Sequence, residues 1–317
     1  MSRLASSPTI ASVPAAVPGW AIPRTPGVDT AEAAFLAGAA LNSLDHLVRA
    51  EHPWAGAWRQ RLALTCAAAA CRLAGRSEDE AALRDAWHLR KPDDDPGPAG
   101  NTLGAWRQLA ARAPTLDVDR LAKVVEWLGL RWDEEFAEIP KALDALPHAG
   151  PAAPFEVVAM MRMLAETAPA AELLAWWLGD LVLARKLQWP RPVPLLMAQV
   201  FGPAFRAGGG RAKRIRPGDD AFAQALCLAL AQGASDACRL ASEISRQAER
   251  LQAVIPKLRA KGAGDAISRL LDDDAVPGTL VTKNLSRFAT RRLFERLEAF
   301  EAVRELSGRP TFRLYGL

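Results

Sequence analysis

The 317-residue chain is 50% apolar and 24% charged, with a formal net charge of +4, a composition typical of a soluble globular protein with room for two domains. Its longest apolar stretch, residues 173–184, is shorter than the roughly 20 residues that cross a bilayer and contains Asp180, so it predicts a buried helix and no membrane partner. The four cysteines show no CxxC spacing, which favours small buried thiols over a metal or redox centre.

Residues 1–28 hold prolines at positions 8, 14, 18, 23 and 26 and no continuous apolar segment. This pattern predicts a disordered Pro/Ala-rich arm instead of a secretory signal peptide, so we expect a cytoplasmic protein. Helical periodicity then begins at Asp29 and Thr30, a pair typical of a helix N-terminus.

Residues 29–255 predict one all-helical domain. Apolar residues recur at steps of three and four in a first helix up to Val48, a second is expected over 54–74, and Ser77 with Glu80 fits a capping box that opens a third. Tryptophans at helical spacings are expected to anchor the core, and no strand alternation is visible here. Further helical patterns lie near 101–112, 117–129, 132–145, 154–167, 170–188 and 193–205, with two more starting at Asp219 and Ser235.

The segment RAGGGRAKRIRPGDD, residues 206–220, predicts an exposed loop with three consecutive glycines, a fourth at Gly218 and five basic residues. It lacks the GK[ST] ending of a phosphate-binding loop. Two interpretations stay open, a solvated connector or an auxiliary contact to nucleic-acid phosphates. The second would use Arg211, Lys213, Arg214 and Arg216.

The helical domain offers few residues for catalysis. Asp45 beside His46 and Asp85 near His88 could meet in a bundle as a carboxylate and imidazole metal site. His46 and His52, however, are six residues apart and cannot share a helix face, and no HExxH, GxSxG or Rossmann glycine pattern occurs. We therefore predict no catalytic residue, no metal and no cofactor, with a metal-dependent enzyme as the least favoured function.

Residues 256–317 are expected to form a separate, basic C-terminal domain. They hold 12 Lys and Arg against 8 Asp and Glu, an excess equal to the net charge of the whole chain. A short helix is expected over 264–274, and a second after Thr282, with an apolar stripe from Leu285 to Phe300. Lys283, Arg287 and Arg291 follow its other side, ahead of three glutamates, an order that opposes the helix dipole.

Two alternating segments, 303–306 and 311–315, surround Gly308 and predict a hairpin with Arg309 at its tip. Helix, helix and basic hairpin is the order of a winged helix-turn-helix, whose wing follows the DNA backbone. The alternative is an exposed helix in which Arg291 pairs with Glu295. The predicted DNA-binding residues are Lys283, Arg287, Arg291, Arg309 and Arg313.

The stretch ATRRLFERLEAFEAVRELSGRPTFRLYGL, residues 289–317, resembles the winged-helix ends of bacterial regulators, especially Fic-associated DNA-binding proteins. The Fic catalytic motif is absent, so the resemblance implies DNA binding without AMP transfer. The glycine-containing turn usual between the two helices of such domains is also missing from VTKNLSRFATRR, residues 281–292. Nearly the whole chain, most clearly residues 44–100, is similar to an uncharacterised alphaproteobacterial family, often plasmid-borne and known as a domain of unknown function.

The sequence thus favours a mainly α protein in which a multi-helix body precedes a small winged helix-turn-helix. We expect a DNA-binding protein, either a transcriptional regulator or a plasmid-maintenance factor, whose body dimerises or holds a protein partner. The alternative is a scaffold subunit of a DNA-organising complex that uses its winged helix to bind protein.

Overall fold

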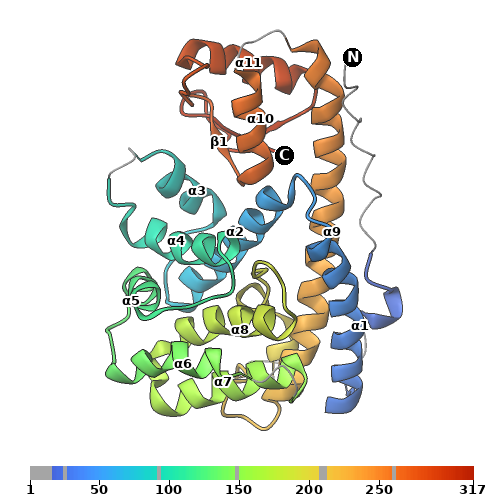
Figure 1. The fold of residues 1–317 in the computed structure, drawn as a ribbon, viewed down its shortest axis with the longest axis vertical. Coiled ribbons are helices and arrows are strands. Elements are labelled where there is room, and N and C mark those ends of the chain that lie inside the picture. Colours follow the sequence, from blue (N-terminus) through green and yellow to red (C-terminus); the bar gives the residue numbers. More distant parts are fainter. Residues whose placement is uncertain (1–15, 24–26, 91–93, 147–149, 207–212, 259–261) are drawn as a thin grey trace, which may run out of the picture.

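The computed structural model describes residues 16–23, 27–90, 94–146, 150–206, 213–258 and 262–317. They form a mainly helical protein that ends in a small antiparallel sheet (Figure 1). This confirms the mainly α prediction at the level of fold class. Within the described ranges, no helix is both long and apolar enough to cross a bilayer.

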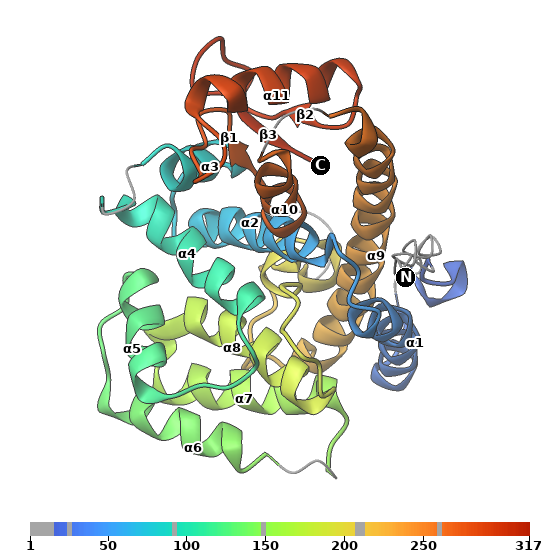
Figure 2. The same ribbon diagram turned by 45° about the horizontal axis from the view of Figure 1, so that its top comes forward.

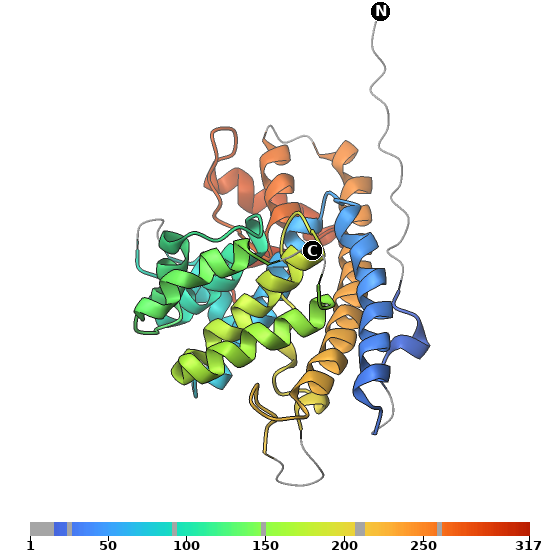
Figure 3. The same ribbon diagram turned by 60° about the horizontal axis from the view of Figure 1, so that its bottom comes forward.

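Two long helices, α1 (Thr30–Arg49) and α9 (Phe222–Val254), pack side by side along the long axis of the molecule (Figures 1 and 3). The Asp29 carboxylate accepts a hydrogen bond from the Glu32 amide at 2.8 Å, as expected of the predicted cap. The predicted break before Ser235 is wrong, because α9 runs through it as one 33-residue helix. At about 1.5 Å per residue, α9 is about 50 Å long.

Ahead of α1, part of the predicted arm packs against the body. Val17 and Ala21 are buried, and Trp20 stacks on Phe35 with ring centroids 5.7 Å apart. Residues 1–15 and 24–26 of the predicted arm lie outside the described residues.

The next helices are α2 (Ala55–Leu73), α3 (Glu80–His88), α4 (Gly97–Ala111), α5 (Val118–Trp127) and α6 (Ile139–Asp144). They continue from α2, which packs against α9 and carries α3 and α4 on its other sides. The predicted cap of α3 is wrong: Asp79, not Ser77, accepts the hydrogen bond from the Ala82 amide, at 2.9 Å. A carboxylate one residue before the helix satisfies an open amide of the first turn.

Helices α7 (Ala153–Thr167) and α8 (Glu172–Lys186) complete the body. Almost all of α8 is buried, which confirms the predicted core helix, and the fully buried Asp180 carboxylate accepts hydrogen bonds from the amides of Leu195 and Leu196. The helix predicted over 193–205 is wrong, because only two 3₁₀ turns form there. Prolines and Gly202 interrupt this segment.

The tryptophans anchor the core as predicted. Trp58, Trp106, Trp176 and Trp177 are each 1% exposed or less. The indole N–H groups of Trp58 and Trp177 donate to the carbonyls of Ala237 and Ala105, both at 2.9 Å. These contacts tie α2 to α9 and α8 to α4.

The tail consists of α10 (Ala263–Asp272), β1 (Val276–Pro277), α11 (Arg287–Ala299), β2 (Arg304–Glu305) and β3 (Leu314–Gly316). The strands form an antiparallel sheet in the order β1-β3-β2, and Tyr315 of β3 pairs with Val276 on one side and Glu305 on the other (Figure 2). Alternation over 311–315 would place Phe312 and Leu314 on one face, but Leu314 is buried whereas Phe312 is 63% exposed. Phe312 has a φ of 54°, so a turn interrupts the alternation there.

Candidate nucleic-acid interface

Helix α11 is held against the sheet by its apolar face. The Phe294 ring stacks on Tyr315 of β3 with centroids 4.6 Å apart and planes 4° apart. Leu293 and Leu297 are buried beside them, and the Thr290 hydroxyl donates to the Leu280 carbonyl at 2.5 Å. The apolar stripe predicted from the sequence therefore fixes which side of α11 faces the solvent.

The other side of α11 exposes four cations and one aromatic ring. Phe288 is 80% exposed, an uncommon position for a large apolar side chain on a helix. The cations are Arg287, Arg291, Arg292 and Arg296. Arg291 pairs with Glu295 at 2.9 Å, as the exposed-helix alternative predicted, but both side chains are exposed and such a pair is weak.

Lys283 lies outside the helix, one turn before its start. The predicted helix start after Thr282 is wrong: α11 begins at Arg287, and the Ser286 hydroxyl accepts from the Ala289 amide at 3.4 Å. Lys283 is exposed within the turn that Thr282 and Leu285 close by backbone hydrogen bonds. It therefore extends the basic surface beyond the N-terminal end of α11.

The hairpin tip turns toward the body. Gly308 has a φ of +62°, a conformation that glycine adopts at little cost, and the Glu305 carboxylate accepts from the amides of Ser307 and Gly308 at 2.7 and 2.8 Å. Burial opposes ionisation of Glu305, but these hydrogen bonds outweigh it and lower its pKa. Arg309 forms an ion pair with Asp85 of α3, so its charge is shared with the body.

Arg313, next to β3, is exposed. Its Nε donates to the Arg309 carbonyl at 3.2 Å, and a hydrogen bond with Tyr315 raises its pKa. The structure thus separates the two predicted hairpin arginines, because Arg309 pairs with the body and Arg313 stays at the surface.

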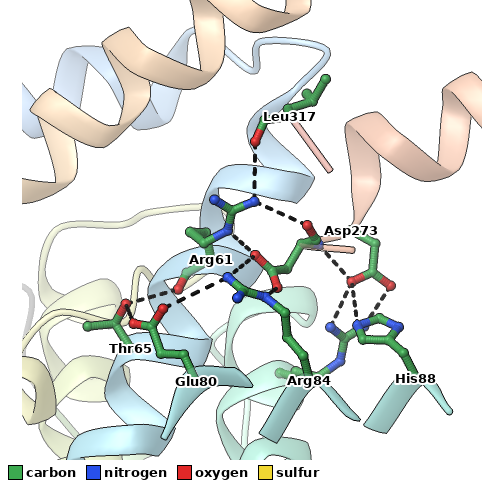
Figure 4. A network of polar contacts seen from close by, with 9 residues as sticks. Arg61, Thr65, Glu80, Arg84, His88, Asp273 and Leu317 are labelled. Atoms are coloured by element: carbon green, nitrogen blue, oxygen red, sulfur yellow. Dashed lines mark hydrogen bonds and ion pairs between the residues drawn. The ribbon is translucent and has the colours of Figure 1, made fainter. Parts of the chain in front are cut away.

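A largely buried ionic cluster fastens the tail to the body (Figure 4). Arg61 of α2 and Arg84 of α3 converge on the Asp274 carboxylate, and Arg84 Nε lies 2.5 Å from Oδ2. Arg107 of α4 donates hydrogen bonds to both carboxylate oxygens of Asp273, at 2.7 and 2.9 Å. We call these five residues the docking cluster. They hold the residues after α10 against three helices of the body.

The electrostatics of the docking cluster follow from burial and pairing. Burial favours the neutral form of Asp273 and Asp274, but the neighbouring arginines outweigh it and lower the pKa of both carboxyls. Arg61 also donates to the carbonyls of Asp274 and Leu317, at 3.2 and 3.3 Å. Burial lowers the pKa of His88, whose Nε2 lies 3.9 Å from Asp273 and has no hydrogen-bond partner among the described residues.

The sequence did not reveal the docking cluster. The partner of Arg61 is Asp274, which lies 213 residues later in the chain. The only sequence signal was the run of three aspartates at 272–274. A run of three carboxylates at the end of a helical pattern looks like a solvated helix end, and only the packing of α10 on α2 brings it to the arginines.

The residues considered for catalysis are not brought together. Asp45 accepts hydrogen bonds from Arg49 and from the Trp189 indole, both at 2.8 Å, whereas Asp85 pairs with Arg309. Among the described residues, no three His, Cys, Asp or Glu side chains gather in a way that could hold a metal ion.

The predicted auxiliary contacts lie at the start of α9, far from α11, which lies near the end of α9 (Figures 1 and 3). Arg214 pairs with Glu172 at 2.6 Å, whereas Lys213 and Arg216 are exposed. Arg211 lies outside the described residues. The structure does not bring the described part of this loop to the basic face of α11.

Comparison with known proteins assigns the chain to a family. Neither a curated protein nor a solved structure matches the chain. The model of the family described as "Protein of unknown function (DUF1403)" matches residues 5–317. Because that match covers nearly every residue, the chain belongs to the DUF1403 family.

Proposed function

We propose that this protein binds DNA through α11 and the turn before it, and acts in the cytoplasm as a transcriptional regulator or plasmid-maintenance factor. The observation that carries the proposal is the exposed face of α11, where Arg287, Arg291 and Arg292 surround Phe288. Arginines bind phosphates and guanine edges, and an exposed apolar ring can contact a thymine methyl group.

The dimensions of α11 suit a DNA groove. Its 13 residues give a length of about 20 Å, and the major groove admits one helix. Its basic half comes first, whereas Glu295 and Glu298 lie in its second half. The proposed contact therefore involves the N-terminal half of α11, as in helices that read base edges with their first turns.

The strand arrangement also supports a winged-helix unit. The chain order is helix α10, strand β1, helix α11 and hairpin β2-β3, with β3 between the other two strands. A complete winged helix-turn-helix has a further helix between its first strand and its recognition helix, whereas residues 278–286 form turns here. We therefore propose a shortened winged helix in which Lys283 lies on the turn that replaces the missing helix.

The wing contributes less in this proposal than the sequence predicted. Arg309 faces Asp85, and the pair reduces the positive charge available to a phosphate. Arg313 forms no ion pair with the described residues and stays part of the proposed surface. The proposed DNA-contacting residues are Lys283, Arg287, Arg291, Arg292 and Arg313.

Salt-dependent binding tests this proposal. Anisotropy of a labelled duplex of about 30 base pairs is measured with the full chain between about 50 and 200 mM salt, for the wild type and for Arg287→Ala/Arg291→Ala. The matched control is Arg112→Ala/Arg131→Ala, two exposed arginines of the body. The logarithmic salt slope should fall by about 0.9 for each phosphate that the first variant no longer neutralises, and it should stay unchanged in the control. Equal effects of both variants, or no binding at the lowest salt concentration, would refute it.

A protein partner is the second candidate. The 80% exposure of Phe288 favours it, because exposed aromatic side chains surrounded by arginines are common in protein interfaces. Under this alternative α11 binds a second copy of the chain or another subunit of a DNA-organising complex. A dimer in sedimentation that Phe288→Ser dissociates, together with no DNA binding at low salt, would favour it.

A further inference from the structure

A basic cavity of about 380 Å³ lies between α9, α2 and the last strands of the tail. Its walls include Arg246 and Arg250 of α9 and Arg304 of β2, with Arg61 and Leu317 beside them. Its volume is within the range of small-molecule sites. The cavity therefore lies where the body meets the tail.

Three arginines of this cavity lack partners within the described part of the chain. Arg246, Arg250 and Arg304 form no side-chain hydrogen bond or ion pair with the described residues, whereas Arg61 is occupied by Asp274. Glu243 is the one carboxylate among the described side chains that line the cavity. It lies 3.8 Å from Arg239, which is not part of the cavity lining. The positive charge that faces the cavity therefore exceeds what its lining side chains neutralise.

Like charges meet at the rim of this cavity, because Arg246, Arg250 and Arg304 are all exposed. Arg246 and Arg250 are four residues apart on one helix, a spacing at which like charges repel. Arg304 adds a third guanidinium from a different element. A multivalent anion would remove the repulsion, and guanidinium groups bind phosphate oxygens through paired N–H donors.

A second cavity of about 450 Å³ adjoins the first and shares Arg61, Leu240 and Glu243 with it. Its other walls include Thr65 and Gln199 together with the charged side chains of Glu80, Asp236 and Arg239. It offers room for a polar part of a ligand whose phosphate end lies among the arginines.

We propose that the basic cavity binds a small phosphorylated organic molecule through Arg246, Arg250 and Arg304. Bound phosphate would link α9 of the body to β2 of the tail, next to the docking cluster. The ligand would therefore stabilise the orientation of α11 relative to the body. The inference does not rest on DNA binding by α11.

Calorimetric titration with inorganic pyrophosphate, at constant ionic strength and without DNA, tests the phosphate end of this site. The wild type should bind saturably with one site per chain. Arg250→Gln and Arg304→Gln should each weaken binding by about tenfold or more, because each removes a charged hydrogen bond. Arg131→Gln, an equal loss of charge at an exposed position of the body, should bind like the wild type.

Circular dichroism of each variant checks that the fold is kept. Pyrophosphate binding that is absent from the wild type, or that survives in Arg250→Gln/Arg304→Gln, overturns the proposal. A double variant that loses duplex affinity while the wild type ignores pyrophosphate also overturns it, because these arginines would then contact the DNA backbone. Pyrophosphate binding in a protein that fails to bind the duplex leaves this site standing and refutes the proposed function alone.

Discussion

Arg107 of α4 donates to both carboxylate oxygens of Asp273, at 2.7 and 2.9 Å, and so joins the body to the residue that follows α10. The pair is mostly buried, with side-chain exposures of 14% and 21%. A paired fork of this kind fixes orientation as well as distance. The tail is therefore docked on the body in a defined orientation, and a basic face on α11 has a fixed position relative to α9.

Breaking this pair should loosen the tail. Asp273→Asn leaves the Arg107 guanidinium buried without its counter-charge, and we expect unfolding in urea to require about 3 kcal/mol less free energy. In the Asp273→Asn variant, the backbone amides of α10 and α11 should exchange with deuterium faster than those of α8. The matched control is Asp144→Asn, which breaks the Arg185 pair at 2.8 Å where the acid is 68% exposed, and should cost about 0–1 kcal/mol. Equal losses of unfolding free energy in the two variants would contradict a docking role for the Arg107–Asp273 pair.

Asp180 should make stability depend on pH. Burial raises its pKa to about 7, although hydrogen bonds from Leu195 and Leu196 act against the rise. Between about pH 4 and 7 the folded protein then binds a proton that the unfolded chain has released, so this group's contribution is most favourable below about pH 4 and declines as the pH rises to 7.

Urea unfolding of the wild type and Asp180→Asn at about pH 5 and pH 8 checks this expectation. The wild type should lose stability relative to the variant as the pH rises, by up to about 1.4 kcal/mol per pH unit below about pH 7. If the difference in unfolding free energy between the wild type and Asp180→Asn is the same at both pH values, the Asp180 carboxyl is ionised throughout this range.

Two phenylalanines of α11 should respond oppositely to truncation. Phe294 is fully buried against Tyr315, so Phe294→Ala should cost about 3–5 kcal/mol of unfolding free energy. Phe288 is 80% exposed, so Phe288→Ala should change stability by less than about 0.5 kcal/mol. Thermal unfolding measures both, and duplex affinity measured on the stable Phe288 variant reports a binding role. A large stability loss for Phe288→Ala would mean that its ring is covered in solution.

Removing the partner of Arg309 should strengthen DNA binding. Asp85→Asn releases the wing-tip guanidinium from its ion pair, and the salt slope of duplex binding should steepen by up to about 0.9 if Arg309 then reaches a phosphate. Asp144→Asn changes the net charge equally at a site of the body away from the tail. If both variants bind the duplex alike, only overall charge matters and the wing stays on the body.

Local sequence patterns predicted most helices of the body. The Asp29 cap, the apolar periodicity of α1 and the buried stretch of α8 were read from neighbouring residues, because helix ends and helix faces depend on spacings of a few residues. Pro and Gly positions gave less reliable boundaries. A new helix was predicted to start at Ser235, yet Gly233 just before it lies inside α9 against Leu195, where tertiary packing outweighs its weak helix propensity.

In the tail, the sequence indicated the identity of the basic residues but not their surroundings. Arg291 and Arg309 looked alike in the sequence, yet Arg291 is exposed beside Glu295 and Arg309 pairs with Asp85. Arg309 and Asp85 are 224 residues apart in the sequence. A contact of such separation depends on how α3 and the hairpin meet.

The sequence by itself determined the helical character of this protein, its apolar core and a basic stripe on α11, because these features follow from local periodicity and residue type. Only the tertiary structure decided which arginines are neutralised and which face the solvent. The reason is that Coulomb interactions depend on distance and burial, and folding brings Asp85, Asp273 and Asp274 to cations far away in the chain. Folding also gathers Arg246, Arg250 and Arg304 around one cavity, where the described side chains supply no matching number of acids.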